Sequence, residues 1–233
     1  MLETNEQKRN KQYSEVFSFL GSQNNPPDFI IKNGDAVEVK KIESKGASLA
    51  LNSSYPKAKL FADSTMITTA CRICEQWDEK DILYAVGVAK SNNLSRLFFV
   101  YGVDYAASAE TYEKIIQPIV QGITSVPDIT FSKTNELARV NKVDPLGITY
   151  FRIRGMWGIE NPAKVFSYVY TPINTEFEFV AVINTEKYNS FPKEDREIIE
   201  KLARDNFKIS DVEIKSPDNP AILKQAKLIT FYR

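Results

Sequence analysis

The sequence predicts one mixed α/β domain, in which a β-sheet is flanked by helices. The chain has 233 residues, which is enough to bury a sizeable core. Its composition is 43% hydrophobic and 26% charged, as in ordinary globular proteins. Apolar segments with strand-like and helix-like spacing follow one another without a repeat or a linker, so we expect a single domain over residues 1–233.

The N-terminal half is predicted to begin with a helix and a β-hairpin. Apolar residues at helical spacing predict a helix over residues 4–20, and Gly21 would end it. Two apolar runs, 28–32 and 35–42, flank Asn33-Gly34, which is a strong signal for a hairpin turn. The later elements expected in this half are a polar stretch over 43–60, a helix over 64–76, strands over 82–89 and 97–103 joined by a turn over 90–95, and a helix over 109–124.

The C-terminal half carries weaker signals. Pro192 suits the first turn of a helix. The elements expected here are a strand-like piece over 148–153, strands over 165–170 and 177–183, a helix over 193–206 and a strand over 226–232. Both halves therefore mix helices and strands, as the α/β class requires.

The chain contains no histidine. Serine–histidine–aspartate hydrolysis, papain-like chemistry and zinc peptidase chemistry all need an imidazole, so these classes are excluded. Any catalysis must use carboxylates, lysine, tyrosine or a hard metal ion. The 30 basic and 30 acidic residues give a net charge of zero, which counts against a non-specific nucleic-acid coat protein but leaves a sequence-specific DNA enzyme open.

Cys71 and Cys74 form a single C-x-x-C pair. A zinc site would need two further ligands, and the chain has no histidine to supply them. We expect two reduced, half-buried cysteines on one helical turn without a chemical role, and a redox pair is the alternative.

No membrane or secretory segment is expected. No apolar run approaches the roughly 20 residues needed to cross a bilayer. The N-terminal residues lack the apolar stretch of a secretory signal. These two observations predict a cytoplasmic protein without membrane contact.

The register of the predicted hairpin decides which side chains lie together. With Lys32, Asn33 and Gly34 as a three-residue loop and Gly34 left-handed in a G1 bulge, Asp28 lies opposite Glu38. The side chains that share one face are then all apolar: Phe29, Ile31, Val37 and Val39. The other face presents Asp28, Glu38 and Lys40 together, because side chains alternate along a strand. A two-residue loop would mix apolar and charged groups on both faces, so burial favours the longer loop.

Two carboxylates on neighbouring strands form a suitable oxygen site for Mg²⁺, which takes few protein ligands and keeps several waters. Such an ion can polarise a phosphate and lower the pKa of a bound water. Lys40 lies two residues beyond Glu38 on the same face, where it can hold the attacking water and stabilise developing negative charge. The alternative is an ordinary hairpin whose charged residues face solvent.

The residues around this hairpin resemble a known group of nucleases. Pro27-Asp28, nine further residues and then Glu38-x-Lys40 resemble the signature of the PD-(D/E)xK nuclease superfamily. The surrounding phrases are more specific: Glu38-Val39-Lys40-Lys41-Ile42-Glu43, Leu49-Ala50-Leu51-Asn52-Ser53-Ser54-Tyr55-Pro56-Lys57, Cys71-Arg72-Ile73-Cys74-Glu75 with Trp77 and Lys80-Asp81, Val100-Tyr101-Gly102, and Asp144-Pro145-Leu146-Gly147-Ile148 leading to Arg152-Ile153-Arg154-Gly155-Met156-Trp157. Together they resemble the NgoPII-type family of type II restriction endonucleases over about residues 10–165.

This resemblance implies a restriction-endonuclease-like mixed sheet flanked by helices, and a homodimer that cuts both strands of a short G/C palindrome such as GGCC with Mg²⁺. It assigns catalysis to Asp28, Glu38 and Lys40, with Asp28 and Glu38 as metal ligands. Many members of the superfamily add an acid from the first helix; Glu15 is the candidate, and a surface glutamate is the alternative. A cognate DNA methyltransferase is also implied. Residues from about 128 to 233 are expected to add recognition and dimerisation elements.

Bidentate arginines are the residues that most often recognise guanine, so a G/C site points to Arg152 and Arg154 on the strand-like 148–154 segment. A structural ion pair with Asp144 or Glu160 is the alternative. The polar stretch after the catalytic strand is expected to contact phosphates and the groove; its candidates are Lys41, Lys45, Ser48, Asn52, Ser53, Ser54, Tyr55 and Lys57. An ordinary solvated loop would have the same composition.

Two other functions fit the same residues. A structure-selective repair or junction nuclease would keep the fold and the catalytic groups but recognise branched DNA. A non-catalytic DNA-binding or interaction module would carry the three charged residues only as a strand face, and no DNA transaction would depend on metal.

Overall fold

A large mixed β-sheet forms the centre of the molecule. The computed structural model describes residues 5–22, 25–51, 54–134, 136–173 and 175–233. Within these residues the sheet has nine strands, eight of them in the order β1-β2-β3-β6-β7-β11-β13-β12, and β5 pairs with β6 off this path. The strands are β1 (Phe17–Ser22), β2 (Asn25–Ile31), β3 (Ala36–Ile42), β5 (Lys59–Phe61), β6 (Glu79–Lys90), β7 (Asn93–Tyr101), β11 (Glu178–Asn184), β12 (Phe207–Lys215) and β13 (Leu223–Tyr232). With its flanking helices, this sheet confirms the predicted α/β class and the restriction-endonuclease-like arrangement.

The sheet mixes parallel and antiparallel pairs, and its outer pairs, β1–β2 and β12–β13, are antiparallel. β3 pairs with β6 in parallel and β7 with β11 in parallel, whereas β2–β3, β6–β7 and β11–β13 are antiparallel. The strand β3, which carries Glu38 and Lys40, therefore lies inside the sheet between β2 and β6.

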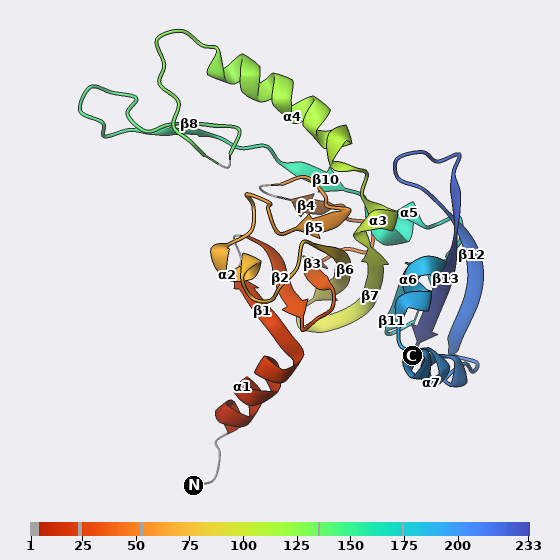
Figure 1. Ribbon diagram of the computed structural model, residues 1–233. Coiled ribbons are helices and arrows are strands. Elements are labelled where there is room, and N and C mark those ends of the chain that lie inside the picture. Colours follow the sequence, from red (N-terminus) through yellow and green to blue (C-terminus); the bar gives the residue numbers. More distant parts are fainter. Residues whose placement is uncertain (1–4, 23–24, 52–53, 135, 174) are drawn as a thin grey trace.

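The first helix, α1 (Asn5–Val16), is shorter than predicted, because residues 17–20 belong to strand β1. Phe17 and Phe19 pair with β2, so an apolar pattern that fits a helix is used here in a strand edge. None of the residues of α1, all of which the structure describes, is buried. The helix extends away from the sheet on the side of the β2–β3 turn (Figure 1).

Three other expectations were wrong in extent or type. The helix expected over 64–76 is reduced to one turn, α2 (Thr69–Arg72), which the Thr68 side chain caps. The strand expected over 165–170 is instead α5 (Pro162–Val165) and the turns after it, because Asn161 caps the backbone at Ala163 and Pro162 fits the first turn. The helix α7 (Lys193–Lys201) ends before residue 206, and a strand that the sequence did not predict, β12, follows it.

An arm projects from the body of the molecule (Figure 1). It consists of α4 (Ala109–Thr124) and the short ribbon of β8 (Ala138–Val140) and β9 (Phe151–Ile153). The helix α4 has the predicted bounds, and none of its residues, all within the described part, is buried. The chain returns through β10 (Trp157–Ile159), which pairs with β4 (Leu49–Leu51), the strand that follows β3 along the chain.

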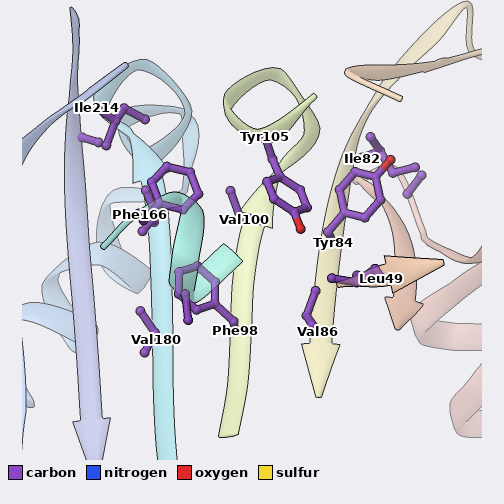
Figure 2. Close-up of a cluster of buried hydrophobic side chains, with 14 of the residues drawn as sticks. Leu49, Ile82, Tyr84, Val86, Phe98, Val100, Tyr105, Phe166, Val180 and Ile214 are labelled. Carbon is purple, nitrogen blue, oxygen red and sulfur yellow. The ribbon is translucent and has the colours of Figure 1, made fainter. Parts of the chain in front are cut away.

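The main core lies on the face of the sheet that carries α3 (Gly102–Tyr105) and α5. Figure 2 shows Tyr84 and Tyr105 side by side near Leu49, and Phe98 of β7 near Phe166, the residue that ends α5. A smaller cluster on the opposite face packs around Tyr188 of α6 (Thr185–Ser190). Among the described residues, no helix is both long and apolar enough to span a membrane.

Candidate active site

The β2–β3 hairpin has the predicted register. Phe29 pairs with Val37, so Asp28 falls opposite Glu38. The loop contains three residues, as expected, but Asn33 (φ 56°) and not Gly34 is left-handed. Gly34 donates its N–H to the Ile31 carbonyl over 2.8 Å, and asparagine tolerates the left-handed conformation at the preceding position.

The burial of the two hairpin faces differs from the prediction. Ile31 and Val39, on the face expected to be buried, are 40% and 48% exposed. The face of Asp28 and Glu38 instead continues into the main core through Ile30 and Ala36, which are fully buried. The charged groups therefore lie at the margin of the core, and this position argues against an ordinary solvated hairpin face.

Asp28 is bound by the backbone of β3 and lies close to the backbone of β1. Its Oδ2 accepts the N–H of Val39 over 2.6 Å. On its other side lies Gly21 of β1, where an added Cβ would be 2.3 Å from the Pro27 carbonyl oxygen and 2.9 Å from that of Asp28. Only glycine permits this close approach, so Gly21 serves strand packing beside Asp28 rather than ending a helix.

Glu38 and Lys40 form a short ion pair, with 2.6 Å between Nζ and Oε1. The Glu38 side chain is 14% exposed, and burial raises its pKa even though Lys40 acts in the opposite direction. Its second oxygen, Oε2, is buried and accepts no hydrogen bond from any described residue. A buried carboxylate oxygen without a donor is costly unless a ligand such as a cation completes it.

The donor set fits a hard divalent cation. The described residues hold no group of three or more His, Cys, Asp or Glu side chains suited to a metal. Asp28 and Glu38 are nevertheless close enough to interact electrostatically, and two carboxylates suffice for Mg²⁺, which keeps several of its waters. Glu15 is not grouped with them: it lies on α1, whose end meets the hairpin turn where Lys32 donates to the Val16 carbonyl.

Lys57 lies beside this carboxylate pair although it comes from the segment between β4 and β5. Burial lowers the pKa of Lys57 to about 8, with Lys40 acting in the same direction and Glu38 opposing both. The Tyr84 hydroxyl fixes the lysine backbone, accepting its N–H over 2.7 Å and donating to its carbonyl over 3.2 Å. Tyr84 is the β6 residue paired with Glu38.

The two candidate base-reading arginines are held by one carboxylate. Arg152 Nε donates to Glu136 Oε2 over 2.7 Å, and Arg154 Nε donates to Oε1 of the same residue. These contacts lower the pKa of Glu136 to about 2. The ion pair with Asp144 or Glu160 considered as an alternative is not formed in the described structure: Asp144 accepts backbone N–H groups of its own turn, and Glu160 pairs with Lys164.

The structure divides the polar stretch after β3 into three groups. Lys41, Lys45 and Ser48 are on the outside of the site, with Lys41 paired to Glu43 and Ser48 donating to Glu160. Ser54, Tyr55 and Lys57 line a cavity of about 420 Å³ that Arg154, Trp157 and α4 also line. Asn52 and Ser53 lie outside the described residues. The cavity lies at the base of the arm, where Tyr55 stacks on Tyr112, and its lining residue Lys57 interacts electrostatically with Glu38.

Cys71 and Cys74 are both free thiols. Cys71 is fully buried in α2, and burial raises the pKa of its thiol to about 11. A thiolate is therefore disfavoured at neutral pH, which agrees with the expected lack of a chemical role.

Two residues of the site were missed by sequence reasoning. Glu136 stands in an irregular segment, and no local pattern marks it as the partner of arginines 16 and 18 positions away. Tyr84 is in a strand correctly predicted as buried, but its hydroxyl contact with Lys57 depends on a tertiary neighbour 27 residues away.

Two comparisons with known proteins gave a match. The model of the NgoPII restriction endonuclease family matches residues 1–215. A type II restriction enzyme, NgoPII of Neisseria gonorrhoeae, is 52% identical over 230 residues, which cover 98% of this chain and 82% of that protein. No solved structure matches the chain. The matched range contains the hairpin, Lys57 and the whole arm.

Proposed function

The chain belongs to the NgoPII restriction endonuclease family and is therefore a type II restriction endonuclease, and we propose that it uses Mg²⁺ to cut both strands of a short G/C palindrome such as GGCC. The unpartnered, buried Oε2 of Glu38 beside Asp28 is the observation that carries the metal dependence. A divalent cation would supply the charge that this oxygen lacks in the protein alone. We leave Glu15 out of the ligand set because of its position on α1.

Mg²⁺ held by Asp28 and Glu38 would polarise the scissile phosphate and lower the pKa of a bound water. In the reaction a water oxygen bonds to phosphorus and one phosphate ester bond breaks, while the proton lost by the water balances the proton gained by the departing alkoxide. The Lys40 ammonium, anchored 2.6 Å from Glu38, holds the attacking water and stabilises the negative charge that grows on the phosphate oxygens.

We assign base recognition to Arg152 and Arg154, because paired guanidinium groups suit the O6 and N7 acceptors of guanine. Both emerge from the ribbon of the arm, and their side chains are 37% and 52% exposed. The remaining proposed contacts, to phosphates and the groove, are Lys41, Lys45, Ser48, Asn52, Ser53, Ser54, Tyr55 and Lys57.

Cutting both strands of a palindrome requires two active sites related by a two-fold axis, so we propose a homodimer. We assign recognition and dimer contacts to the region from about 128 to 233, which includes the ribbon of the arm and the C-terminal strands. A DNA methyltransferase that modifies the same site is the expected partner activity, since an unprotected cellular chromosome would be cut.

The test compares wild type, Lys40→Ala and Lys32→Ala on unmethylated phage DNA, with Mg²⁺ or with EDTA. Lys32 is an exposed residue of the same hairpin and serves as the matched control. We expect discrete, Mg²⁺-dependent fragments from wild type and Lys32→Ala, and none from Lys40→Ala, which should still bind the specific duplex. Normal cutting by Lys40→Ala would refute the catalytic assignment, and nicking of branched DNA alone would indicate a junction nuclease.

A further inference from the structure

We propose that Lys57 is a second lysine of the catalytic centre, which donates hydrogen bonds to a non-bridging oxygen of the phosphate that is cut. This inference rests on the proposed function and deepens it. The proposed function gives Lys57 only a contact with phosphates or the groove, for which an exposed cation near the site would be enough. Four features of the structure separate Lys57 from the other lysines of its segment.

The first is the rigid placement of its backbone. One hydroxyl, that of Tyr84, contacts both the N–H and the carbonyl of Lys57. Tyr84 is 2% exposed and is the direct β6 neighbour of Glu38. The residue that packs beside the metal-ligand strand therefore also sets the position of the lysine.

The second is a close backbone approach on the opposite side. A Cβ on Gly102 would lie 2.3 Å from the Lys57 carbonyl oxygen and 2.5 Å from that of Ala58. Gly102 begins α3 directly after β7, so the lysine segment is packed against the end of a central strand. A loop that only followed the DNA surface would not need this contact.

The third is the lack of a counter-ion. Two nearby lysines have carboxylate partners: Lys59 pairs with Glu79 over 2.5 Å and Lys41 with Glu43 over 3.6 Å, whereas Lys45 is exposed to solvent. Within the described residues, no carboxylate oxygen lies within 4.0 Å of Lys57 Nζ, which is 5.5 Å from the centre of the Tyr55 ring. A half-buried ammonium without a partner carries a desolvation cost, and its depressed pKa reflects this cost.

The fourth is the position of the side chain in the cavity that Tyr55, Arg154 and α4 also line. There Lys57 is electrostatically coupled to Glu38 and Lys40. A phosphate entering this cavity would bring the missing negative charge to Lys57. Because negative charge on the phosphate oxygens grows during hydrolysis, a fixed cation contributes more in the transition state than in the ground state.

The experiment measures single-turnover cleavage with Mg²⁺, and binding of the specific duplex with Ca²⁺, for wild type, Lys57→Met, Lys57→Ala and Lys59→Met. We expect Lys57→Met to lower the cleavage rate at saturating enzyme by about 10²–10³-fold, as for loss of one donor to developing charge. Binding should weaken far less than the rate. Lys59→Met, which removes an ion-paired lysine two residues away, should behave as wild type.

A rescue measurement separates a chemical role from a structural one. Propylammonium should restore part of the Lys57→Ala activity, whereas tetramethylammonium at equal ionic strength should not, because it has no N–H donor. Thermal unfolding of each variant gives the folded fraction. If both neutral variants unfold, Lys57→Arg is measured against wild type: it keeps the charge but moves the N–H donors, so its cleavage rate at saturating enzyme should fall while its binding of the specific duplex is kept.

Each contrary result has its own meaning. A Lys57 variant could cut at the wild-type rate at saturating enzyme but bind DNA more weakly, with the salt dependence of binding reduced by about one phosphate contact. This result would make Lys57 a groove contact and overturn the inference. Folded Lys57 variants that cut normally, or a failure of propylammonium to restore any activity, would also overturn it. If wild type itself cut no DNA with Mg²⁺, the proposed function would fall, and the inference with it.

Discussion

The carboxylate of Asp28 accepts the backbone N–H of Val39 over 2.6 Å, so one metal-ligand candidate is anchored to the strand that carries the other. In the observed register Pro27 would face Val39, and the Pro27 carbonyl would be the ladder acceptor for the Val39 N–H. Asp28 thus replaces a backbone interaction at the point where the strand pair ends. Its charge and its structural contact can be separated by mutation.

Asp28→Asn should abolish cleavage and leave the fold intact, because the amide oxygen can still accept the Val39 N–H. Asp28→Ala loses both roles and should also lower the free energy of unfolding by about 1.5–3 kcal/mol, the range for loss of a hydrogen bond to a charged group. Urea denaturation of wild type and both variants measures the difference. Equal stability of the two variants would show that the contact with Val39 contributes little.

Glu38→Gln should stabilise the protein at pH 7.5 in EDTA. Burial raises the pKa of Glu38 above its ordinary value of 4.5, so the native state binds the proton more tightly than the unfolded chain. The stability that this proton contributes is complete below pH 4.5 and is lost as pH rises through the higher native pKa. Denaturation curves between pH 4 and 8 should therefore show the advantage of Glu38→Gln shrinking as the pH falls. A variant less stable than wild type at pH 7.5 would contradict the cost assigned to the buried carboxylate.

Mg²⁺ should make wild type more stable than Glu38→Gln, which is the reverse of the order expected in EDTA. A ligand that binds only the native state stabilises it by about 2.7 kcal/mol at one hundred times its Kd. Wild type should gain stability as Mg²⁺ is raised, whereas Glu38→Gln, which lacks one of two ligand carboxylates, should gain much less. Thermal unfolding over a Mg²⁺ series checks this, with K⁺ at equal ionic strength as the control. Equal gains in the two proteins would place the metal elsewhere.

The proximity of Asp28, Glu38 and Lys40 was predictable because it depends on local signals along the hairpin. Asn33-Gly34 sets the loop, and the alternation of Phe29 and Val37 with Asp28 and Glu38 selects the register. The same local logic failed at residues 17–20, where the spacing of Phe17, Phe19 and Leu20 suits a helix and pairing with β2 makes a strand.

Contacts between distant segments could not be derived in this way. Lys57 was expected to touch DNA, but its place beside Glu38 depends on the Tyr84 hydroxyl and on the space that Gly102 leaves. For the arginines, two acidic partners were considered from sequence, and the structure places a third, Glu136, between them. Proximity of this kind arises from the fold, and spacing along the chain does not encode it.

The pairing of Glu136 with Arg152 and Arg154 makes a prediction about specificity. Its carboxylate offsets part of the positive charge of the ribbon and fixes the direction of both guanidinium groups. Glu136→Gln should therefore bind non-specific DNA more tightly and discriminate less well against altered sites, whereas Arg152→Ala or Arg154→Ala should lose about 1–3 kcal/mol of base discrimination. The measurement is the Kd for cognate and single-substituted duplexes over a range of salt, with Glu176→Gln, in the segment before β11, as a charge-matched control. If Glu136→Gln changed both Kd values equally, the residue would tune charge alone, and the orientation of the arginines would not depend on it.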